Sequence, residues 1–345
     1  MNDQPIRWGI LGCGDVTERK SGPAFQKASG SQLTAVMRRD GGKAKDYAGR
    51  HGVPFWTANA DELINHPDVD IVYVSTPPGA HLELALKVCA AGKPCYVEKP
   101  MARSAAESAV MLEAFRRANL PLFIAFYRRG MDRFKITKQL LAENRLGTLT
   151  SISHIFESPR LPGLDPAQLP WRLVATEAGA GLFYDLGSHL LDIFDFFFGP
   201  LENVAGLAAN LASPYDVEDT VSMSFSAAGI PAVARWNFAA FNSRDEIELT
   251  GTAGKLTFSC FGAEPLRLET AAGIEQIPAE PPPHVHQPLV QTIVDQLHGA
   301  GKCPSTPVSA LRTMRVMDTV LDSYYGGRRD DFWTRPASWP GRARA

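Results

Sequence analysis

The sequence predicts two domains: an α/β domain with a parallel sheet, then an α+β domain with an open, mostly antiparallel sheet. Two patterns lead to this expectation. Over residues 1–127 short apolar runs alternate with helical patterns, and over residues 128–345 strand-like segments follow one another with few helical patterns between them. The length of 345 residues points the same way, because a single hydrophobic core usually stops growing below that size.

The first domain contains short runs of apolar, β-type residues. They are IRWGIL, LTAVM, DIVYVST, PCYVE and LFIAF. Runs that are apolar throughout suit strands buried on both faces, as in a parallel sheet between two layers of helices. Helical stretches such as LELALKVCAAG and AAESAVMLEAFRRA separate them, which is the rhythm of βαβ units. We therefore expect a doubly wound sheet.

A glycine-rich run, GILGCGDVT, overlaps the end of the first apolar run. Gly12 and Gly14 match the first two glycines of the dinucleotide fingerprint G-x-G-x-x-G/A, whereas Thr17 occupies the third position. An isolated G-x-G is more often an ordinary turn. Here it lies at the first strand-to-helix turn, where backbone N–H groups can hold a pyrophosphate. We predict a Rossmann domain that binds its cofactor through Gly12, Gly14, Asp15 and Val16.

Composition and charge exclude several partners. With 35 basic and 37 acidic residues, the chain has no overall positive field that would attract nucleic acid or an anionic membrane. No apolar run approaches the ~20 residues of a membrane-spanning helix, and MNDQPIRWG lacks a signal-peptide core, so we expect a cytoplasmic protein. The five cysteines show no C-x-x-C spacing and are expected to be reduced. His284 and His286 form an H-x-H pair without a third ligand nearby, so no metal site is predicted.

Strand-like segments dominate the second domain after a helical stretch at 133–144. They are LTSISHIFES, ENVAGLAANLA, DTVSMSFSAA, IPAVARWNFAA, DEIELTGTAG and KLTFSCF. In DTVSMSFS, apolar Val221, Met223 and Phe225 alternate with serines, which predicts an antiparallel sheet covered on one face. The sequence leaves open whether the other face is solvated or pairs with a second subunit. A proline-rich linker, AEPPPHVHQP, precedes two closing helical patterns.

Polar residues follow two buried runs of the first domain. Because α/β sheets bind ligands at the carboxyl ends of their parallel strands, STPPGAH and YVEKP are candidate cofactor segments. Glu98 and Lys99 would otherwise be an ordinary solvated pair, but their place at a strand end favours a functional role. The residues expected at the cofactor in these segments are Ser75, Thr76, Pro77, His81, Glu98 and Lys99.

The segment GAGLFYDLGSHLLDIFDFFFG carries a carboxylate and an imidazole four residues apart. On a helix Asp185 and His189 would share one face, and Gly187 keeps that face open. A histidine among leucines and phenylalanines is more often a core residue. A neighbouring carboxylate, however, can fix its tautomer and stabilise the imidazolium, as acid–base chemistry requires. Asp192 and Asp195 lie out of register with that face and are expected to be structural or solvated.

Two further pairs are candidates for a binding cleft. Tyr127 and Arg128 follow the last apolar run of the first domain and are expected to contact the substrate. Trp171 and Arg172 lie in a loop before the glycine segment and are expected to contact the cofactor. The alternative for each is an ordinary surface arginine or a packed aromatic side chain.

These motifs, in this order, resemble the signatures of the Gfo/Idh/MocA oxidoreductases, a family named for glucose–fructose oxidoreductase, inositol dehydrogenase and a rhizopine-catabolism protein. The matching stretches are RWGILGCGDVT, DIVYVSTPPGAH, AGKPCYVEKPMA and GLFYDLGSHLLD, and the resemblance covers nearly the whole chain. It implies NAD(P)-dependent oxidation or reduction of sugars, cyclitols or related diols, and a homodimer or homotetramer formed through the second-domain sheet. It also implies that Lys99, Asp185 and His189 bind the substrate and form the catalytic set. Thr17 departs mildly from the family pattern.

The chemistry of hydride transfer suggests a role for each catalytic candidate. A proton must move on the substrate oxygen while hydride moves at the carbon, so the site needs an acid–base group and a group that stabilises oxyanion charge. His189 suits the first task and Lys99 the second, with Asp185 orienting His189. Two other classes stay open: an NAD-dependent glycosidase acting by oxidation and elimination, and a non-catalytic NAD(P)-binding regulator. The absence of a signal-peptide pattern in MNDQPIRWG disfavours the glycosidase. The presence of all three catalytic candidates disfavours the non-catalytic regulator.

The choice between NAD and NADP depends on the end of the second strand. In NAD-selective Rossmann domains an acidic residue about 20 residues past the glycines accepts hydrogen bonds from the ribose 2′-hydroxyl. A strand ending near Met37 places Arg38 and Arg39 where they can pair with a 2′-phosphate. Asp40 takes the ribose position only if the strand runs further. We therefore expect NADP to be favoured over NAD.

Overall fold

A computed structural model describes residues 4–328 and 331–342. The chain divides into two compact units: a first unit of Met1–Met131 with Pro282–Leu311, and a second unit of Asp132–Pro281 with Arg312–Ala345. Residues 282–311, which the sequence pattern placed with the second domain, therefore belong to the first unit. The linker and the helix after it carry the chain back to the core from which it started.

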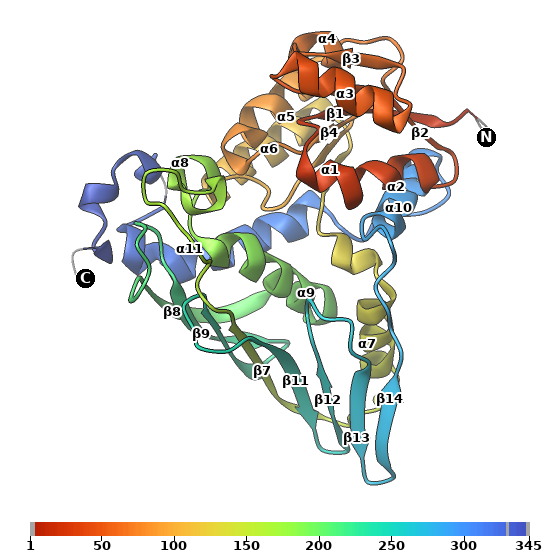
Figure 1. The fold of residues 1–345 in the computed structure, drawn as a ribbon. Helices are drawn as coiled ribbons and strands as arrows, with labels where there is room; N and C mark the ends of the chain where they lie inside the picture. Colours follow the sequence, from red (N-terminus) through yellow and green to blue (C-terminus); the bar gives the residue numbers. More distant parts are fainter. Residues whose placement is uncertain (1–3, 329–330, 343–345) are drawn as a thin grey trace. The chain divides into compact units, whose positions relative to one another are not determined.

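The first unit is built on a parallel sheet of six strands in the order β3-β2-β1-β4-β5-β6 (Figure 1). This is the strand order of a Rossmann fold, so the predicted α/β class is confirmed. The order reverses between β1 and β4, whose carboxyl ends lie side by side at the point where open α/β sheets bind ligands. The strands are β1 (Ile6–Leu11), β2 (Ser31–Met37), β3 (Phe55–Thr57), β4 (Ile71–Val74), β5 (Cys95–Val97) and β6 (Leu122–Ile124).

The helices of the first unit begin and end at capping residues. Asp40 caps α3 by accepting a hydrogen bond from Lys43 N, and Gly52 ends that helix at φ +65°. Ser104 caps α6 in the same way. The helical segments are α1 (Asp15–Arg19), α2 (Gly22–Lys27), α3 (Gly41–His51), α4 (Ala60–Ile64), η1 (Pro78–Ala80), α5 (His81–Ala90), α6 (Ala105–Ala118), η2 (Tyr127–Gly130) and α10 (Gln287–Leu297).

An aromatic cluster fills the part of this core into which the returning segment packs. Trp8, Phe25, Tyr73 and Tyr96 are fully buried, and Tyr73 stacks on Tyr96 with ring centroids 4.9 Å apart. Helix α10 packs on α2 and η2. α10 approaches η2 so closely that position 130 requires glycine, because a Cβ at Gly130 would lie 2.8 Å from the backbone nitrogen of Leu289 in α10.

The second unit contains a sheet of eight strands in the order β14-β13-β12-β11-β7-β10-β9-β8. Neighbouring strands are antiparallel except β7 and β10, which run parallel, so the predicted α+β class is confirmed. The strands are β7 (Leu149–Glu157), β8 (Leu201–Ala209), β9 (Thr220–Ala227), β10 (Ile230–Asn237), β11 (Arg244–Gly251), β12 (Gly254–Phe258), β13 (Leu266–Thr270) and β14 (Gly273–Ile277).

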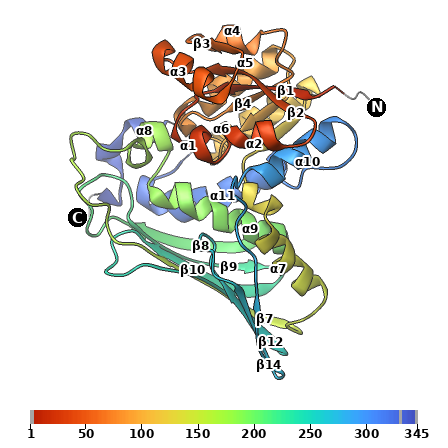
Figure 2. The ribbon, with the colours of Figure 1, turned by 45° about the vertical axis from the view of Figure 1, so that its right-hand side comes forward.

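Helices cover one face of this sheet. Figure 2 shows α9 (Ser188–Phe198) and α11 (Pro307–Tyr325) on one side, and none of the described helices on the other. The alternation in β9 matches this arrangement, because Val221, Met223 and Phe225 are buried. The remaining helical segments are α7 (Asp132–Ala142), η3 (Trp171–Leu173), α8 (Ala175–Ala178), η4 (Phe183–Gly187), η5 (Phe332–Thr334) and η6 (Pro336–Ser338).

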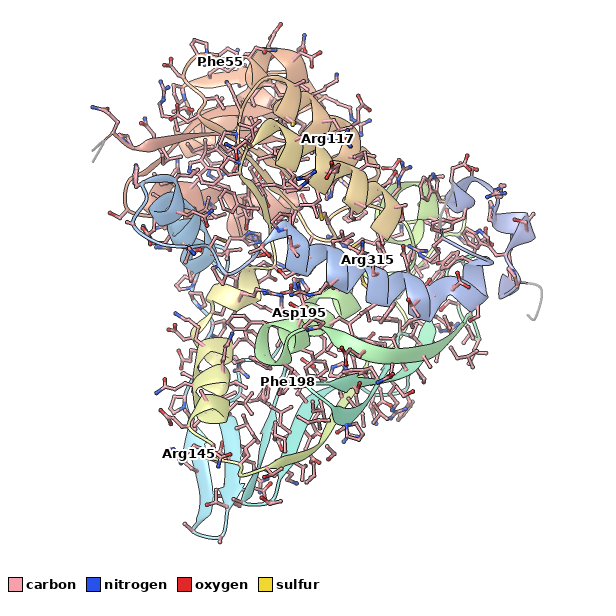
Figure 3. The ribbon with its side chains drawn as sticks, turned by 180° about the vertical axis from the view of Figure 1, so that it is seen from behind. Phe55, Arg117, Arg145, Asp195, Phe198 and Arg315 are labelled. Carbon is pink, nitrogen blue, oxygen red and sulfur yellow. The ribbon has the colours of Figure 1, made fainter. Side chains whose placement is uncertain are left out.

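An ion pair joins the two covering helices. Asp195 of α9, labelled in Figure 3, accepts hydrogen bonds through both carboxylate oxygens, at 2.7 and 2.9 Å, from Arg312 of α11. Asp192 is fully buried. Of the two roles expected for these aspartates, structural or solvated, burial excludes the solvated one, and the ion pair gives Asp195 a structural contact. Neither α9 nor any other helix among the described residues is long and apolar enough to cross a membrane.

Candidate functional site

The glycine run makes a tight turn between β1 and α1. Gly12 has φ +91°, and a Cβ there would lie 2.9 Å from Thr76 Cγ2 and 3.1 Å from Thr76 N, so only glycine fits. Gly12 N donates to Met37 O at 2.9 Å, which ties the turn to the end of β2. A Cβ at Gly14 would meet no atom closer than Gly12 O at 3.8 Å, so this glycine leaves room for a ligand.

Thr17 explains the departure from the glycine fingerprint. Its buried hydroxyl accepts from Gly14 N at 2.9 Å and donates to Gly14 O at 2.8 Å, closing the turn with its side chain. The close packing expected of the third glycine falls instead to Gly22, where a Cβ would lie 2.1 Å from Thr17 O. Asp15 is exposed and Val16 half-buried in α1.

The residues after β4 face this turn. Ser75 Oγ donates to Gly12 O at 2.9 Å, and Pro77 starts the short helix η1. The hydroxyl of Thr76 is buried and has no hydrogen-bond partner within residues 4–328 and 331–342. The open side of Gly14 and this hydroxyl fit a polar ligand at the switch point, as a dinucleotide requires.

His81 links the end of β4 to the segment after β5. Its Nε2 lies 2.7 Å from Thr76 O and its Nδ1 lies 3.1 Å from Pro100 O. Burial lowers the pKa of His81, although these carbonyl groups oppose the shift. The ring therefore lies between the two strand ends that were predicted as cofactor segments.

The arginines after β2 lie where the sequence predicted them. β2 ends at Met37, and Arg38 Nη1 donates across the glycine turn to Cys13 O at 3.3 Å. Arg39 is exposed. Asp40 caps α3, and the backbone N–H of Lys43 lowers the pKa of its carboxyl group. The condition under which Asp40 would take the ribose role, a longer strand, is not met.

Glu98 and Lys99 follow β5. The Glu98 carboxylate is buried, accepts a short hydrogen bond from the Tyr73 hydroxyl, and accepts one from Lys99 N at 3.0 Å. Lys99 itself is half-buried. Tyr127 and Arg128 lie in η2 and are buried, with the guanidinium carbon of Arg128 5.0 Å from the Tyr127 ring centroid. These two pairs follow the neighbouring strands β5 and β6.

In the second unit, Asp185 lies in a π-helical turn, η4, that leads into α9. Such turns are rare and occur frequently at functional sites. Arg172 Nε donates to Asp185 Oδ2 at 3.0 Å, and the guanidinium of Arg172 lies over the Trp171 ring, 4.3 Å from its centroid. The loop pair and the carboxylate, which the sequence predicted separately, are thus in contact.

His189 lies in the first turn of α9 and is buried. The Phe261 ring meets its imidazole edge to face, with centroids 5.8 Å apart. Phe261 belongs to the loop after β12 and is half-buried. An imidazole four residues after a carboxylate held by arginine is suited to proton transfer, with Phe261 packed against one side of the ring.

Sequence reasoning missed the residues that hold these segments. Asp245 of β11 accepts from Phe261 N at 2.7 Å and from the Ser259 hydroxyl. Burial alone would raise the pKa of Asp245, but its contacts with His154, Ser259 and Phe261 N outweigh burial and lower it. Arg133 of α7 donates to the carbonyl groups of Ser259, Glu264 and Ala279 in and after the same loop.

A second missed acid, Glu218, holds the glycine segment before Asp185. Its fully buried carboxylate accepts from Gly181 N at 3.0 and 3.1 Å and from the Tyr325 hydroxyl. Burial raises the pKa of Glu218. Gly181 is required here, because a Cβ would lie 2.5 Å from Glu218 O. No local motif marks either acid, and only their burial reveals their roles.

The H-x-H pair separates in the structure. His284 Nδ1 lies 3.1 Å from Arg19 O near the surface. His286 is buried beside Glu98 and Tyr96. Within the described part of the chain, no group of three or more His, Cys, Asp or Glu side chains is placed to hold a metal ion.

Comparison with known protein families identifies the family of this chain. Residues 6–126 match the model described as "Oxidoreductase family, NAD-binding Rossmann fold", and residues 134–257 match the Gfo/Idh/MocA C-terminal domain. The chain belongs to the Gfo/Idh/MocA family. The resemblance seen in the sequence is confirmed, and with it the assignment of the protein as an oxidoreductase with an NAD-binding Rossmann fold.

Three relatives illustrate the family. Oxidoreductase P35 of Formosa agariphila is 35% identical over 91% of this chain and 97% of its own length. The 1,5-anhydro-D-fructose reductase of Ensifer adhaerens is 28% identical over 87% of this chain and 90% of its own. Levoglucosan dehydrogenase, solved with NADH and levoglucosan, superimposes with a TM-score of 0.83 at 21% identity, covering 93% of this chain and 97% of that one. At this identity, the similarity to levoglucosan dehydrogenase shows a shared fold.

The Asp245 contacts predict a pH-dependent stability. Asp245→Asn should lower the free energy of unfolding by about 1–3 kcal/mol near pH 7, because Phe261 N and Ser259 lose a charged acceptor. The folded-state pKa lies below the ordinary 3.8, so this contribution is complete above pH 3.8 and is lost as the pH falls below it.

Urea denaturation at several pH values checks this expectation. The difference between parent and Asp245→Asn should shrink below pH 3.8. Asp46→Asn is the matched control, because Asp46 pairs with Arg50 at the surface with 63% of its side chain exposed, and it should change stability by less than about 0.5 kcal/mol. Equal stability of Asp245→Asn and parent at neutral pH would contradict the proposed role.

Proposed function

We propose that the protein transfers a hydride between NADP(H) and a carbinol or carbonyl carbon of a sugar, cyclitol or related diol. The observation that carries the proposal is a buried imidazole, His189, that follows an arginine-held carboxylate, Asp185, in a chain of this oxidoreductase family. The relatives support the substrate class, because one is a 1,5-anhydro-D-fructose reductase and another a levoglucosan dehydrogenase.

Each residue has one task in the proposed reaction. The nicotinamide, when bound, supplies or accepts the hydride. His189 takes the proton from the substrate hydroxyl during oxidation and returns it to the carbonyl oxygen during reduction. Lys99 stabilises the negative charge that develops on that oxygen. Asp185 orients His189, and Tyr127 and Arg128 contact the substrate.

The cofactor would be held by the first-unit turn and the adjacent strand ends. Gly12 and Gly14 allow the pyrophosphate to approach the backbone, with Asp15 and Val16 at the helix start. Thr76 offers its buried hydroxyl. Further cofactor contacts are proposed for Ser75, Pro77, His81, Glu98, Lys99, Trp171 and Arg172.

NADP is the proposed cofactor because of what ends β2. Arg38 reaches the glycine turn with its guanidinium, and Arg39 is exposed beside it. Both are suited to a 2′-phosphate. Asp40, the acid that would repel this phosphate, is engaged in capping α3. The NADH bound to levoglucosan dehydrogenase does not decide the matter, since that protein is only 21% identical.

A homodimer or homotetramer is proposed through the uncovered face of the second-unit sheet. The exposed side chains on that face are of mixed polarity: Ser222 of β9 pairs with Leu207 and with Arg235, and Ser224 pairs with Val233. Val233 is 56% exposed, Leu207 61% and the Arg235 side chain 48%. A sheet face of mixed polarity that no helix covers suits the packing of a second subunit.

The catalytic roles predict large losses of turnover. Lys99→Ala and His189→Ala should each lower kcat by roughly 10²-fold or more while the protein still binds its cofactor. Reduction of 1,5-anhydro-D-fructose, and oxidation of levoglucosan, inositols and open-chain diols, are followed by nicotinamide absorbance. Glycoside cleavage is assayed in parallel.

Surface residues of the same types give the controls. Lys45→Ala and His298→Ala should keep the parent turnover, because Lys45 is exposed and His298 Nε2 lies 3.2 Å from Gln4 O near the start of the chain. Near-parent kcat in either catalytic variant would remove that residue from the mechanism. Glycoside cleavage without net nicotinamide change would replace the proposal by the elimination chemistry of an NAD-dependent glycosidase.

The NADP preference is tested by titration. The parent should bind NADPH more tightly than NADH, and Arg38→Ala should reduce this ratio by roughly 10-fold, since a hydrogen bond to a charged group contributes about 1.5–3 kcal/mol. Arg39→Ala should reduce it to a smaller extent. Arg117→Ala is the control, because Arg117 pairs with Glu113 at the surface of α6 (Figure 3). Tighter NADH binding by the parent would overturn the preference.

The oligomer is tested by light scattering. At micromolar concentration the parent should show at least twice the mass of one chain. Val233→Arg should shift the mass toward that of one chain, because it places a charge on the proposed contact face. Val110→Arg, at a residue 52% exposed on α6, should leave the mass unchanged. A monomeric parent would contradict the proposal.

A further inference from the structure

His286 is a polar side chain in an aromatic core. It lies at the start of α10, in the segment that returns to the first unit, and it is 1% exposed. Its neighbours include the ring of Tyr127, with centroids 4.4 Å apart, and the hydroxyl of Tyr96, 3.2 Å from His286 Nδ1. A phenylalanine could fill this space without the free-energy cost of burying a polar group, so the presence of an imidazole needs a physical explanation.

The contacts of His286 define one tautomer. Its Nε2 lies 3.5 Å from Glu98 Oε1, and a carboxylate oxygen can only accept, so the proton belongs on Nε2. Nδ1 then accepts from the Tyr96 hydroxyl. Burial, with the positive charges of Lys20, Lys99 and Arg128, lowers the pKa of His286 to about 3, which keeps the ring neutral.

Glu98 connects this ring to Lys99. One carboxylate oxygen, Oε1, faces the Tyr73 hydroxyl and His286, while the other, Oε2, accepts from Lys99 N at 3.0 Å. Glu98 N donates to Val74 O at 2.9 Å, which anchors the backbone on β4. With both oxygens engaged, the carboxylate has one orientation, and the backbone from which the Lys99 side chain starts is fixed.

The same ring also reaches the next strand end. Tyr127 packs on His286, and Arg128 lies over Tyr127. Glu98 follows β5 and Tyr127 follows β6, so a single side chain from the returning segment contacts both neighbouring strand ends. These two ends carry the proposed oxyanion-stabilising lysine and the proposed substrate contacts.

We propose that His286 is a positioning residue: through Glu98 and Tyr127 it aligns Lys99 and η2 for hydride transfer, although it touches neither substrate nor cofactor. This inference rests on the proposed function of Lys99. His286 lies in the segment 282–311 that belongs to the first unit. His284, two positions earlier in the same segment, has no such contact, since its ring nitrogen meets Arg19 O near the surface.

Three variants test the inference with the full-length protein. His286→Phe keeps the packing on Tyr127 but loses both polar contacts, His286→Gln keeps a donor and an acceptor, and His284→Phe is the matched control. For each we measure kcat, KM, the affinity for NADPH by fluorescence, the melting temperature, and the isotope effect on kcat. The substrate is the panel compound that the parent oxidises with the highest turnover, with deuterium at the carbinol carbon that gives up the hydride.

We expect His286→Phe to lower kcat by roughly 10-fold, with little change in KM or in NADPH affinity. The isotope effect should rise, because misalignment slows the chemical step, whereas a smaller folded fraction would lower kcat and leave the isotope effect unchanged. His286→Gln should recover most of the turnover. His284→Phe should match the parent in every measurement.

Some results would overturn the inference. They are a kcat of His286→Phe within twofold of the parent, or a loss of kcat at parent isotope effect. If His286→Phe does not fold, Glu98→Gln decides instead: a raised isotope effect supports the positioning role, and a parent-like one contradicts it. A parent that turns over no panel compound would refute the proposed function first, and the inference would fall with it.

Discussion

The close approach of two strand ends is the constraint on which the first unit depends. β1 and β4 are neighbours at the switch point of the sheet, so the chain leaving β1 must turn directly against the chain leaving β4. Gly12 permits this at φ +91°, in contact with Thr76, and Ser75 closes the junction by donating to Gly12 O. The same turn accepts Arg38 at Cys13 O. Backbone N–H groups, a free hydroxyl and a guanidinium are thereby gathered at one place.

In the second unit, the mostly apolar helix α9 carries polar side chains of the candidate site. α9 is buried along most of its length, so each of its polar side chains needs a defined partner. Asp195 has Arg312, and in the turn η4 just before α9 the carboxylate of Asp185 has Arg172 from the preceding loop. His189 lies between these two aspartates in the chain and meets the edge of Phe261.

Local pattern was enough to predict the sheet classes and the residues at strand ends. Buried runs such as IRWGIL coincide with β1, and Arg38 follows β2 because apolar residues stop at Met37. Three strands escaped prediction: β3 has three residues, every residue of β14 before Ile277 is exposed, and β13 has five residues of which only Leu266 and Leu268 are apolar. The membership of residues 282–311 in the first unit depends on packing between distant segments, which periodicity does not contain.

Three acids that hold segments of the candidate site share one chemistry. Glu98 and Glu218 are buried and Asp245 is half-buried, and each carboxylate accepts from a backbone N–H in a segment that carries a candidate site residue: Lys99 N, Gly181 N and Phe261 N. Acidic residues are normally exposed, so sequence reasoning places them at the surface unless a motif intervenes, as it did for Glu98 alone.

A carboxylate suits this task better than an amide because it accepts from two directions at once and its charge strengthens each bond. In all three cases a side-chain hydroxyl, from Tyr73, Tyr325 or Ser259, binds the same carboxylate as the backbone N–H. The hydrogen bond from the hydroxyl offsets part of the free-energy cost of removing the carboxylate from water, and it fixes the orientation of the carboxylate. Loops near the candidate site are thus held by groups inside the core, and the surface of those loops stays available for ligands.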